Sequence, residues 1–291
     1  MKDLQRISVI GMGLLGGSVS LAIRQRMPGT VVVGYSHRAA TRSRARSSAL
    51  ATEVADDLKA AVTQADLVIL ATPIFTFEHY FAEISATIPS GCIVTDVGST
   101  KVLPHRWAEQ SLGKQAHYVG SHPIAGSEQR GLEFARDDLL AQARCILTTT
   151  PQTHRASAAT LRQFWSDLGC YVQTMTPEDH DRVFANISHL PHLIAAGLVN
   201  ASDWQDVKYA GKGFLDSTRI ASGPANIWTD VLLANGDNIA DGIERVLAEL
   251  TKLRKAVQDR DRKEIEALLE AARRKRASLV KYKIRKKELL S

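Results

Sequence analysis

The sequence predicts an α/β protein in which a parallel-sheet domain is followed by an all-helical domain. Over the first 175 residues, short apolar runs alternate with segments of helical periodicity, the pattern of a parallel sheet with helices on its faces. A glycine-rich loop follows the first of these runs. Beyond residue 175 the strand-like runs stop, so we predict domains of residues 1–175 and 176–291.

Each predicted strand is a short, mostly apolar run bounded by helical or turn-forming segments. Such runs are typical of strands that are buried on both faces. We expect Tyr171–Met175 to add a strand at one edge of the sheet. The other predicted strands are Ile7–Ile10, Val31–Tyr35, Leu67–Ala71, Cys92–Val97, His117–Ser121 and Cys145–Thr149.

The second half begins with a helix-start signal. Thr176 is placed to cap a helix, and Pro177 lies in its first turn together with two acidic residues. From there the chain has helical character almost to its end, apart from a loop that contains Gly211 and Gly223. The last segment, from about Val246, sets leucines among dense charges, as amphipathic helices do.

Composition indicates a globular protein, with 44% hydrophobic and 23% charged residues. The net charge of +6 is modest for 291 residues, and neither zinc-finger spacing nor an aromatic RNA-binding motif accompanies it. We therefore expect small polyanionic ligands and no nucleic acid. Since no apolar run approaches the length of a membrane span and no signal core precedes the first strand, we expect no membrane association and a cytoplasmic location.

A G-x-G-x-x-G motif follows the first predicted strand and opens a helix. Its glycines allow a tight turn, close approach of a pyrophosphate, and close packing of helix on strand. The helix N-terminus directs N–H groups and the positive end of its dipole at the phosphates. The sequence therefore predicts a dinucleotide site in a Rossmann-type domain, formed by Gly11, Gly13, Leu14, Leu15 and Gly16.

The end of the second predicted strand bears on cofactor choice. An NAD site usually carries an acidic residue there for the ribose 2′-hydroxyl, but this chain has Ser36, followed by His37 and Arg38. Without a carboxylate nothing repels a 2′-phosphate, and Arg38 can pair with one. We predict NADP, with NAD as the alternative, in which case the arginines here form an ordinary solvated helix face.

Polar residues follow the later strands at the edge where their carboxyl ends meet. Thr72 and Pro73 end one strand, Ser99 follows the next, and His122 follows the one after. Ligands of open parallel sheets bind at this edge, so we expect Ser99 and His122 to project into the same crevice. A histidine in that setting is a candidate general base.

The helical half supplies further polar candidates. His189 and His192 are three residues apart and would share one helix face. Such a pair could ligate a metal, but no third ligand lies at supporting spacing, so we expect no metal site. Asp216, Arg219 and Trp228 follow in the next segment.

At these residues the chain resembles the prephenate/arogenate dehydrogenase family of tyrosine biosynthesis. The likeness includes the glycine loop and extends through the helical half. Its motifs are Ala71-Thr72-Pro73, Asp96-x-x-Ser99-x-Lys101, Gly120-x-His122-Pro-x-Ala-Gly126, Ser188-His-Leu-Pro-His192 and Gly213-Phe-x-Asp-x-Thr-Arg219-Ile-Ala.

The resemblance implies a Rossmann domain joined to a helical dimerisation domain, and hence a homodimer. It implies oxidation of prephenate or arogenate to 4-hydroxyphenylpyruvate or tyrosine with loss of CO2. His122 would accept the proton of the ring hydroxyl, with Ser99 orienting it, and Arg219 would hold a substrate carboxylate. The remaining substrate-site residues would be His189, His192, Asp216 and Trp228. For Asp216 the alternative is a partner for Arg219, and for Trp228 it is core packing.

Two rival functions stay open at this stage. A β-hydroxyacid dehydrogenase or imine reductase shares the same plan, but the former resembles a family with a lysine on the helix between its domains, whereas Pro177–Ser202 has none and contains histidines. A non-catalytic NADP sensor would need the glycine loop but not Ser99, His122 and Arg219. The sequence does not distinguish prephenate from arogenate.

Overall fold

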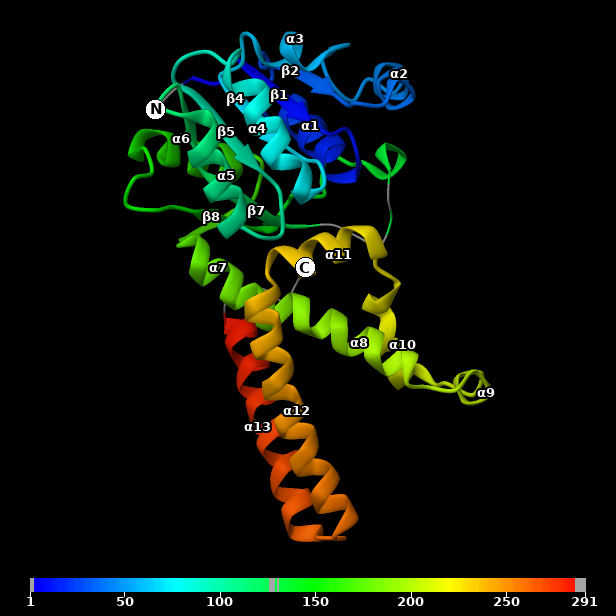
Figure 1. Ribbon diagram of the computed structural model, residues 1–291. Coiled ribbons are helices and arrows are strands. Elements are labelled where there is room, and N and C mark those ends of the chain that lie inside the picture. Colours follow the sequence, from blue (N-terminus) through cyan, green and yellow to red (C-terminus); the bar gives the residue numbers. More distant parts are fainter. Residues whose placement is uncertain (1–2, 126–128, 130, 286–291) are drawn as a thin grey trace. The chain divides into compact units, whose positions relative to one another are not determined.

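The computed structural model describes residues 3–125, 129 and 131–285, and it forms two compact units, Met1–Gly236 and Asp237–Ser291 (Figure 1). The first unit contains both the sheets and the helices that follow them. The second consists of the last two helices. The predicted domain boundary near residue 175 falls inside the first unit and stays a prediction.

The main sheet has six parallel strands in the order β3-β2-β1-β4-β5-β6. This order, in which β2 and β4 lie on opposite sides of β1, is that of a Rossmann domain, so the predicted fold class is confirmed. The strands are β1 (Arg6–Ile10), β2 (Val31–Tyr35), β3 (Glu53–Val54), β4 (Leu67–Leu70), β5 (Cys92–Asp96) and β6 (Ala116–Tyr118).

Helices cover both faces of this sheet, because alternate strand residues point to opposite sides. In β4, Leu67 and Ile69 join the core cluster that contains residues of α1 (Leu14–Arg26) and α6 (Arg155–Asp167). Val68 and Leu70 join the cluster beneath the helices on the other face. Those helices are α3 (Leu58–Val62), α4 (Phe77–Ser85) and α5 (Val102–Leu112), while α2 (Ala39–Ser47) follows β2.

The predicted sheet is wrong at its end, because Cys145–Thr149 and Tyr171–Met175 lie in a separate sheet and do not extend the parallel one. His117–Ser121 does not form a single strand of the parallel sheet, because the chain leaves that sheet after Tyr118. It resumes as β7 (Gly120–Ile124), which pairs antiparallel with β8 (Arg144–Thr148) in a separate sheet of order β7-β8-β9, where β9 is Tyr171–Met175. Pro123 is tolerated because β7 is an edge strand of that sheet.

The helical segment begins as predicted. Thr176 accepts a hydrogen bond from the backbone N–H of Asp179 (3.1 Å), and Pro177 is the first residue of α7. One turn of π-helix at Ala185–His189 joins α7 to α8. The helices of this part are α7 (Pro177–Phe184), α8 (Leu190–Asn200), α9 (Trp204–Val207), α10 (Lys212–Thr218) and α11 (Ala225–Ala234), with short 3₁₀ turns at Ile74–Thr76 (η1), Leu132–Phe134 (η2) and Arg219–Ser222 (η4).

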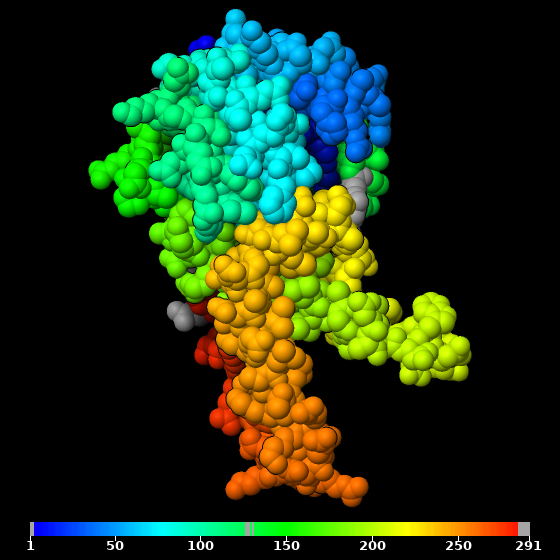
Figure 2. Space-filling model, viewed as in Figure 1, coloured from blue at the N-terminus to red at the C-terminus, as the bar shows by residue number. Residues whose placement is uncertain are grey.

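The second unit is a pair of long helices, α12 (Gly236–Gln258, whose first residue ends the first unit) and α13 (Arg262–Arg285). In Figure 2 these helices are orange and red, and the light-green segment around α9 projects from the first unit. Among the described residues, no helix is both long and apolar enough to span a membrane.

Candidate active site

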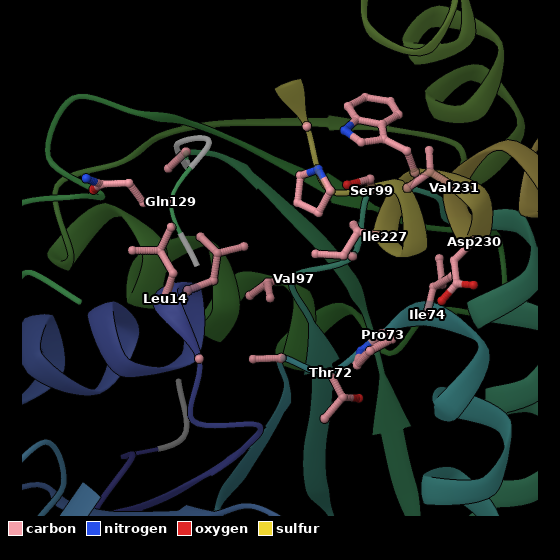
Figure 3. A pocket seen from close by; sticks show the side chains of 18 of the residues that line it. Leu14, Thr72, Pro73, Ile74, Val97, Ser99, Gln129, Ile227, Asp230 and Val231 are labelled. Atoms are coloured by element: carbon pink, nitrogen blue, oxygen red, sulfur yellow. The ribbon is translucent and has the colours of Figure 1, made fainter. Parts of the chain in front are cut away.

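A cavity of about 590 Å³ lies in the first unit, beside the carboxyl ends of β1, β4 and β5 (Figure 3). Figure 3 shows Leu14 at one side of the cavity and Ile227 of α11 at the other. The cavity therefore brings together residues predicted for the cofactor and residues predicted for the substrate. Those that line it are Gly13, Leu14, Leu15, Thr72, Pro73, Ser99, His192, Arg219 and Trp228.

The glycine loop is shaped by close backbone contacts. Gly11 has a φ of +105°, and a Cβ placed there would lie 2.4 Å from the carbonyl oxygen of Ala71. A Cβ on Gly16 would lie 1.8 Å from the carbonyl oxygen of Gly11. Gly13 differs, because a Cβ there meets nothing within 4 Å and would point into open space. Two glycines thus close the loop, and the third leaves the start of α1 accessible to a phosphate.

The turn after β2 has basic side chains but no acidic one on Ser36–Arg38. The Ser36 side chain is buried, and Arg42 donates to the carbonyl oxygens of Ser36 (2.7 Å) and His37 (3.1 Å). Arg38 precedes α2 and makes no ion pair with any residue in the described ranges. Arg42 therefore supports the turn, and Arg38 is available to a ligand.

The turns that follow β4 and β5 line the cavity. After β4, the hydroxyl of Thr76 donates to the carbonyl oxygen of Pro73 (2.6 Å) and bonds the hydroxyl of Thr72 (2.7 Å). After β5, Gly98 donates its N–H to Asp96 (2.6 Å), which fixes the turn that carries Ser99. Both turns are therefore held by local hydrogen bonds and present their polar groups to the cavity.

The wall of the cavity that α8, η4 and α11 form, called here the helical wall, contains a stacked pair of aromatic rings. The rings of His192 and Trp228 lie 3.4 Å apart at 29°, and Gly223 packs so closely on them that a Cβ there would be 2.5 Å from Trp228 Nε1. Partial burial lowers the pKa of His192. Arg219 lies on the 3₁₀ turn before Gly223, so a cation and a flat aromatic surface share this wall.

Other predicted residues lie outside the cavity lining. His122 is buried on β7, three residues before Ala125, which does line the cavity. His189 is fully buried, with its Nδ1 3.2 Å from the amide of Asn235. Asp216 is exposed and forms an ion pair with Lys212 (3.0 Å). Gly126, the last residue of the motif around His122, lies outside the described residues.

A buried polar cluster behind the cavity was not predicted. The fully buried Lys101 ammonium pairs with Asp96 and donates to the carbonyl oxygen of Ser121 (2.7 Å). Tyr118 donates to the other oxygen of Asp96 (2.6 Å), and burial raises the pKa of its hydroxyl. The motif Asp96-x-x-Ser99-x-Lys101 contains two of these residues. A lysine that follows a strand is nevertheless expected to be exposed to solvent unless its partner is known.

The histidines around this cluster are held neutral. Burial, followed by the charge of Lys101, lowers the pKa of His105 to about 4. Burial also lowers the pKa of His189 to about 4, and the pKa of His122 falls well below its usual value for the same first reason. A neutral imidazole has a free lone pair, which a proton acceptor needs. Within the described ranges, no group of three or more metal-binding side chains is placed to hold a metal ion.

Comparison with known proteins covers both halves of the chain. Residues 19–174 match the model of the prephenate dehydrogenase nucleotide-binding domain, and residues 176–271 match that of the prephenate dehydrogenase dimerization domain. A prephenate dehydrogenase of Bacillus subtilis is 34% identical over 268 residues, covering 90% of this chain and 72% of the relative.

Solved structures give the same result. A prephenate dehydrogenase from A. aeolicus, crystallised with hydroxyphenyl propionate and NAD+, has a TM-score of 0.88 at 31% identity and covers 96% of this chain and 99% of its own. An arogenate dehydrogenase from Synechocystis has a TM-score of 0.81 at 28% identity, over 94% of this chain and 99% of its own. The two family models thus match residues 19–174 and 176–271, and these structures align with nearly the whole chain.

Proposed function

The chain belongs to the prephenate dehydrogenase family, and we propose that it oxidises prephenate or arogenate with loss of CO2. It is a nicotinamide-dependent oxidoreductase, and its membership of this family decides against the hydroxyacid dehydrogenase, imine reductase and sensor alternatives. One observation carries the substrate proposal: a single cavity is lined by the glycine loop, by Ser99, and by the wall that contains Arg219 and the His192–Trp228 stack.

The residues of the glycine loop fit a dinucleotide. Gly11 and Gly16 leave no room for a side chain, and Gly13 lines the cavity where α1 begins. Gly13, Leu14 and Leu15 would hold the pyrophosphate through backbone N–H groups, and Thr72 and Pro73 would flank the nicotinamide. The bound nicotinamide supplies the acceptor for the hydride that leaves ring carbon C4 of the substrate.

In this proposal, His122 and Ser99 act together to remove the proton of the substrate's ring hydroxyl. The ring hydroxyl must lose its proton as C4 is oxidised, and decarboxylation then yields an aromatic ring. His122 is neutral because burial lowers its pKa, so its lone pair is available. Ser99 lines the cavity and would orient the hydroxyl by a hydrogen bond.

In this proposal, residues of the helical wall bind the substrate. Arg219 provides a planar guanidinium that suits a carboxylate. Trp228, with His192 stacked on it, offers an apolar face to the substrate ring. His189 lies behind this stack, edge-on to Trp228 with the ring centres 6.2 Å apart, and supports it. Asp216, paired with Lys212, would lie at the periphery of the site.

A direct assay tests the reaction. Purified protein should reduce a nicotinamide cofactor, followed by its absorbance, when supplied with prephenate or arogenate, each tested with NADP and with NAD. Turnover with either substrate supports the proposal, and the ratio of the kcat/KM values gives the substrate preference. Cofactor binding without turnover in all four mixtures would refute it.

For the cofactor we propose NADP in preference to NAD. The support is the turn after β2, where Ser36 replaces an acidic residue and Arg38 makes no ion pair with a described residue. A charge-assisted contact to the 2′-phosphate contributes roughly 1.5–3 kcal/mol. Arg38→Ser should therefore lower kcat/KM with NADP about 10- to 100-fold and leave the value with NAD nearly unchanged.

Arg46→Ser is the matched control for that experiment. Arg46 lies on the same helix, but its guanidinium already pairs with Asp56 (2.7 Å), so its loss should affect both cofactors little. The preference for NADP would be contradicted if Arg38→Ser lowered kcat/KM equally with NADP and NAD. It would also be contradicted if the wild-type protein had a higher kcat/KM with NAD than with NADP.

We further propose a homodimer formed by the helical domain that begins near residue 176. The match to a dimerization domain over residues 176–271 supports it. Large apolar side chains also remain exposed on the last two helices, among them Leu247, Leu250 and Leu269 at 50%, 53% and 58%. Sedimentation velocity should give twice the chain mass, and a monomer at micromolar concentration would count against this proposal.

A further inference from the structure

A chain of three buried side chains leads away from the proposed base. Nδ1 of His122 lies 2.9 Å from Nε2 of His180, and Nδ1 of His180 lies 2.8 Å from Oδ1 of Asp181. The chain runs from β7 to α7, and the exposed fractions are 9% for His122, 0% for His180 and 1% for Asp181. Each contact has the length of a good hydrogen bond.

The far end of this chain is a fixed acceptor. Asp181 receives the backbone N–H of Lys101 on Oδ1 (2.7 Å) and that of Val102 on Oδ2 (2.9 Å). These residues begin α5, so the Asp181 carboxylate caps that helix at the positive end of its dipole. Asn235 also donates to the Asp181 carbonyl oxygen (2.7 Å), which ties the residue to the end of α11. With N–H donors on both of its oxygens, the carboxylate acts as an acceptor toward His180.

The direction of the remaining protons follows. Because Asp181 accepts, Nδ1 of His180 must carry the proton, and a neutral imidazole has only one N–H. Nε2 of His180 is then an acceptor, so Nδ1 of His122 must donate to it. That leaves Nε2 of His122 without a proton.

The charges around the chain keep both rings neutral. Burial lowers the pKa of His180 first, followed by the charge of Lys101. The pKa of His122 is lowered by burial and then by its neighbours. The groups facing the two rings are Lys101 with its partner Asp96, His105, His189 and Asp181. Phe184 stacks on His180 with ring centres 4.5 Å apart and fixes the ring plane.

We propose that His180 and Asp181 are positioning residues that hold His122 in the tautomer with the proton on Nδ1 and with Nε2 as the proton acceptor. This inference rests on the proposed function for its kinetic consequence. The ring hydroxyl proton passes to Nε2, and His122 becomes a cation. Its Nδ1–H bond to His180 is kept throughout, and the Asp181 carboxylate at the end of the chain stabilises the new charge.

The first test is the tautomer itself. Nitrogen NMR on ligand-free protein with labelled histidine, assigned by the signals lost in His122→Asn, distinguishes a protonated ring nitrogen from a bare one. We expect Nδ1 of His122 to carry the proton and Nε2 to be bare at neutral pH. A proton on Nε2 of His122 would overturn the proposal whatever the enzyme's activity.

The second test uses two substitutions of His180. His180→Phe keeps the ring volume and the contact with Phe184 but removes the acceptor. His180→Gln has an amide that can donate to Asp181 and accept from His122. Since general base catalysis supplies roughly 10²–10⁴ in rate, His180→Phe should lower kcat about 10- to 100-fold with little change in KM. His180→Gln should restore most of that loss.

The outcomes separate the two proposals. Full kcat in His180→Phe, or equal losses in a correctly folded His180→Gln, would overturn the positioning role. No turnover by the unchanged protein would refute the proposed function, whereas the NMR result on the same protein would still decide the tautomer. Urea unfolding midpoints of both variants show whether a loss of activity reflects loss of fold, and if His180→Phe does not fold, the tautomer measurement decides alone.

Discussion

Alanine substitutions in the glycine loop should separate its structural role from its binding role. Gly13 and Gly16 both lie where α1 begins, three residues apart, yet their surroundings differ. A Cβ on Gly16 would be 1.8 Å from the carbonyl oxygen of Gly11, whereas one on Gly13 meets no atom within 4 Å. Gly16→Ala should therefore disturb the fold, and Gly13→Ala should disturb only the cofactor.

The magnitudes follow from these distances. For Gly16→Ala, backbone must move by about 1 Å or more, and overpacking of this kind costs about 1–3 kcal/mol, partly offset by the better helix propensity of alanine. For Gly13→Ala the unfolding free energy should change by less than about 1 kcal/mol. Gly13 lines the cavity, so its new methyl group occupies space beside the pyrophosphate. The cofactor Kd should rise at least about tenfold, or 1.4 kcal/mol.

Two measurements on each variant check this prediction. Urea unfolding of the ligand-free protein, followed by circular dichroism, gives the free energy of unfolding. Calorimetric titration with NADP and with NAD gives the Kd. The reasoning is refuted if Gly16→Ala is as stable as the unchanged protein, or if Gly13→Ala binds both cofactors with an unaltered Kd.

Two further predictions concern the buried polar groups. His189 is held neutral by burial, with a pKa of about 4 against 6.5 in an unfolded chain. Below pH 6.5 the unfolded state therefore binds a proton that the folded state does not. Acidification to pH 4 should lower the free energy of unfolding by about 3 kcal/mol. Urea unfolding across that range should show the loss, and His189→Gln should show a shallower one; a pH-independent stability would contradict this. Lys101→Met leaves the buried Asp96 carboxylate without its cation and should lower the unfolding free energy by about 3–5 kcal/mol, whereas an unchanged urea midpoint would show that the pair contributes nothing.

The main sheet was predictable because its signals are local. The central strands are runs buried on both faces, as in β4, where all of Leu67–Leu70 is buried, whereas the short edge strand β3 is exposed or half-buried and was not predicted. The helix start at Thr176 was predictable for the same reason, since cap and acceptor are three residues apart. The division of His117–Ser121 into β6 and β7 was not, because it depends on β7 pairing with β8 more than twenty residues later in the chain.

The candidate site divides in the same way. The glycine loop, Ser99 and Arg219 were found from motifs, and the structure places them around one cavity. The partner of His122 was missed because 58 residues separate it from His180. A histidine followed by an aspartate in the first turns of a helix does not by itself indicate a partner for a catalytic histidine. Only the structure shows that the ring of His180 faces His122.

Asp181 shows why such a partner is structural and functional at once. Its carboxylate caps α5 through the N–H groups of Lys101 and Val102 and also accepts from His180. The strand β5 ends at Asp96, and the turn between it and α5 carries Ser99. Any movement of α5 relative to α7 would therefore change the separation between the hydroxyl of Ser99 and the ring of His180. Because one carboxylate joins these two helices, the geometry between Ser99 and His122 is set by the packing of the fold itself.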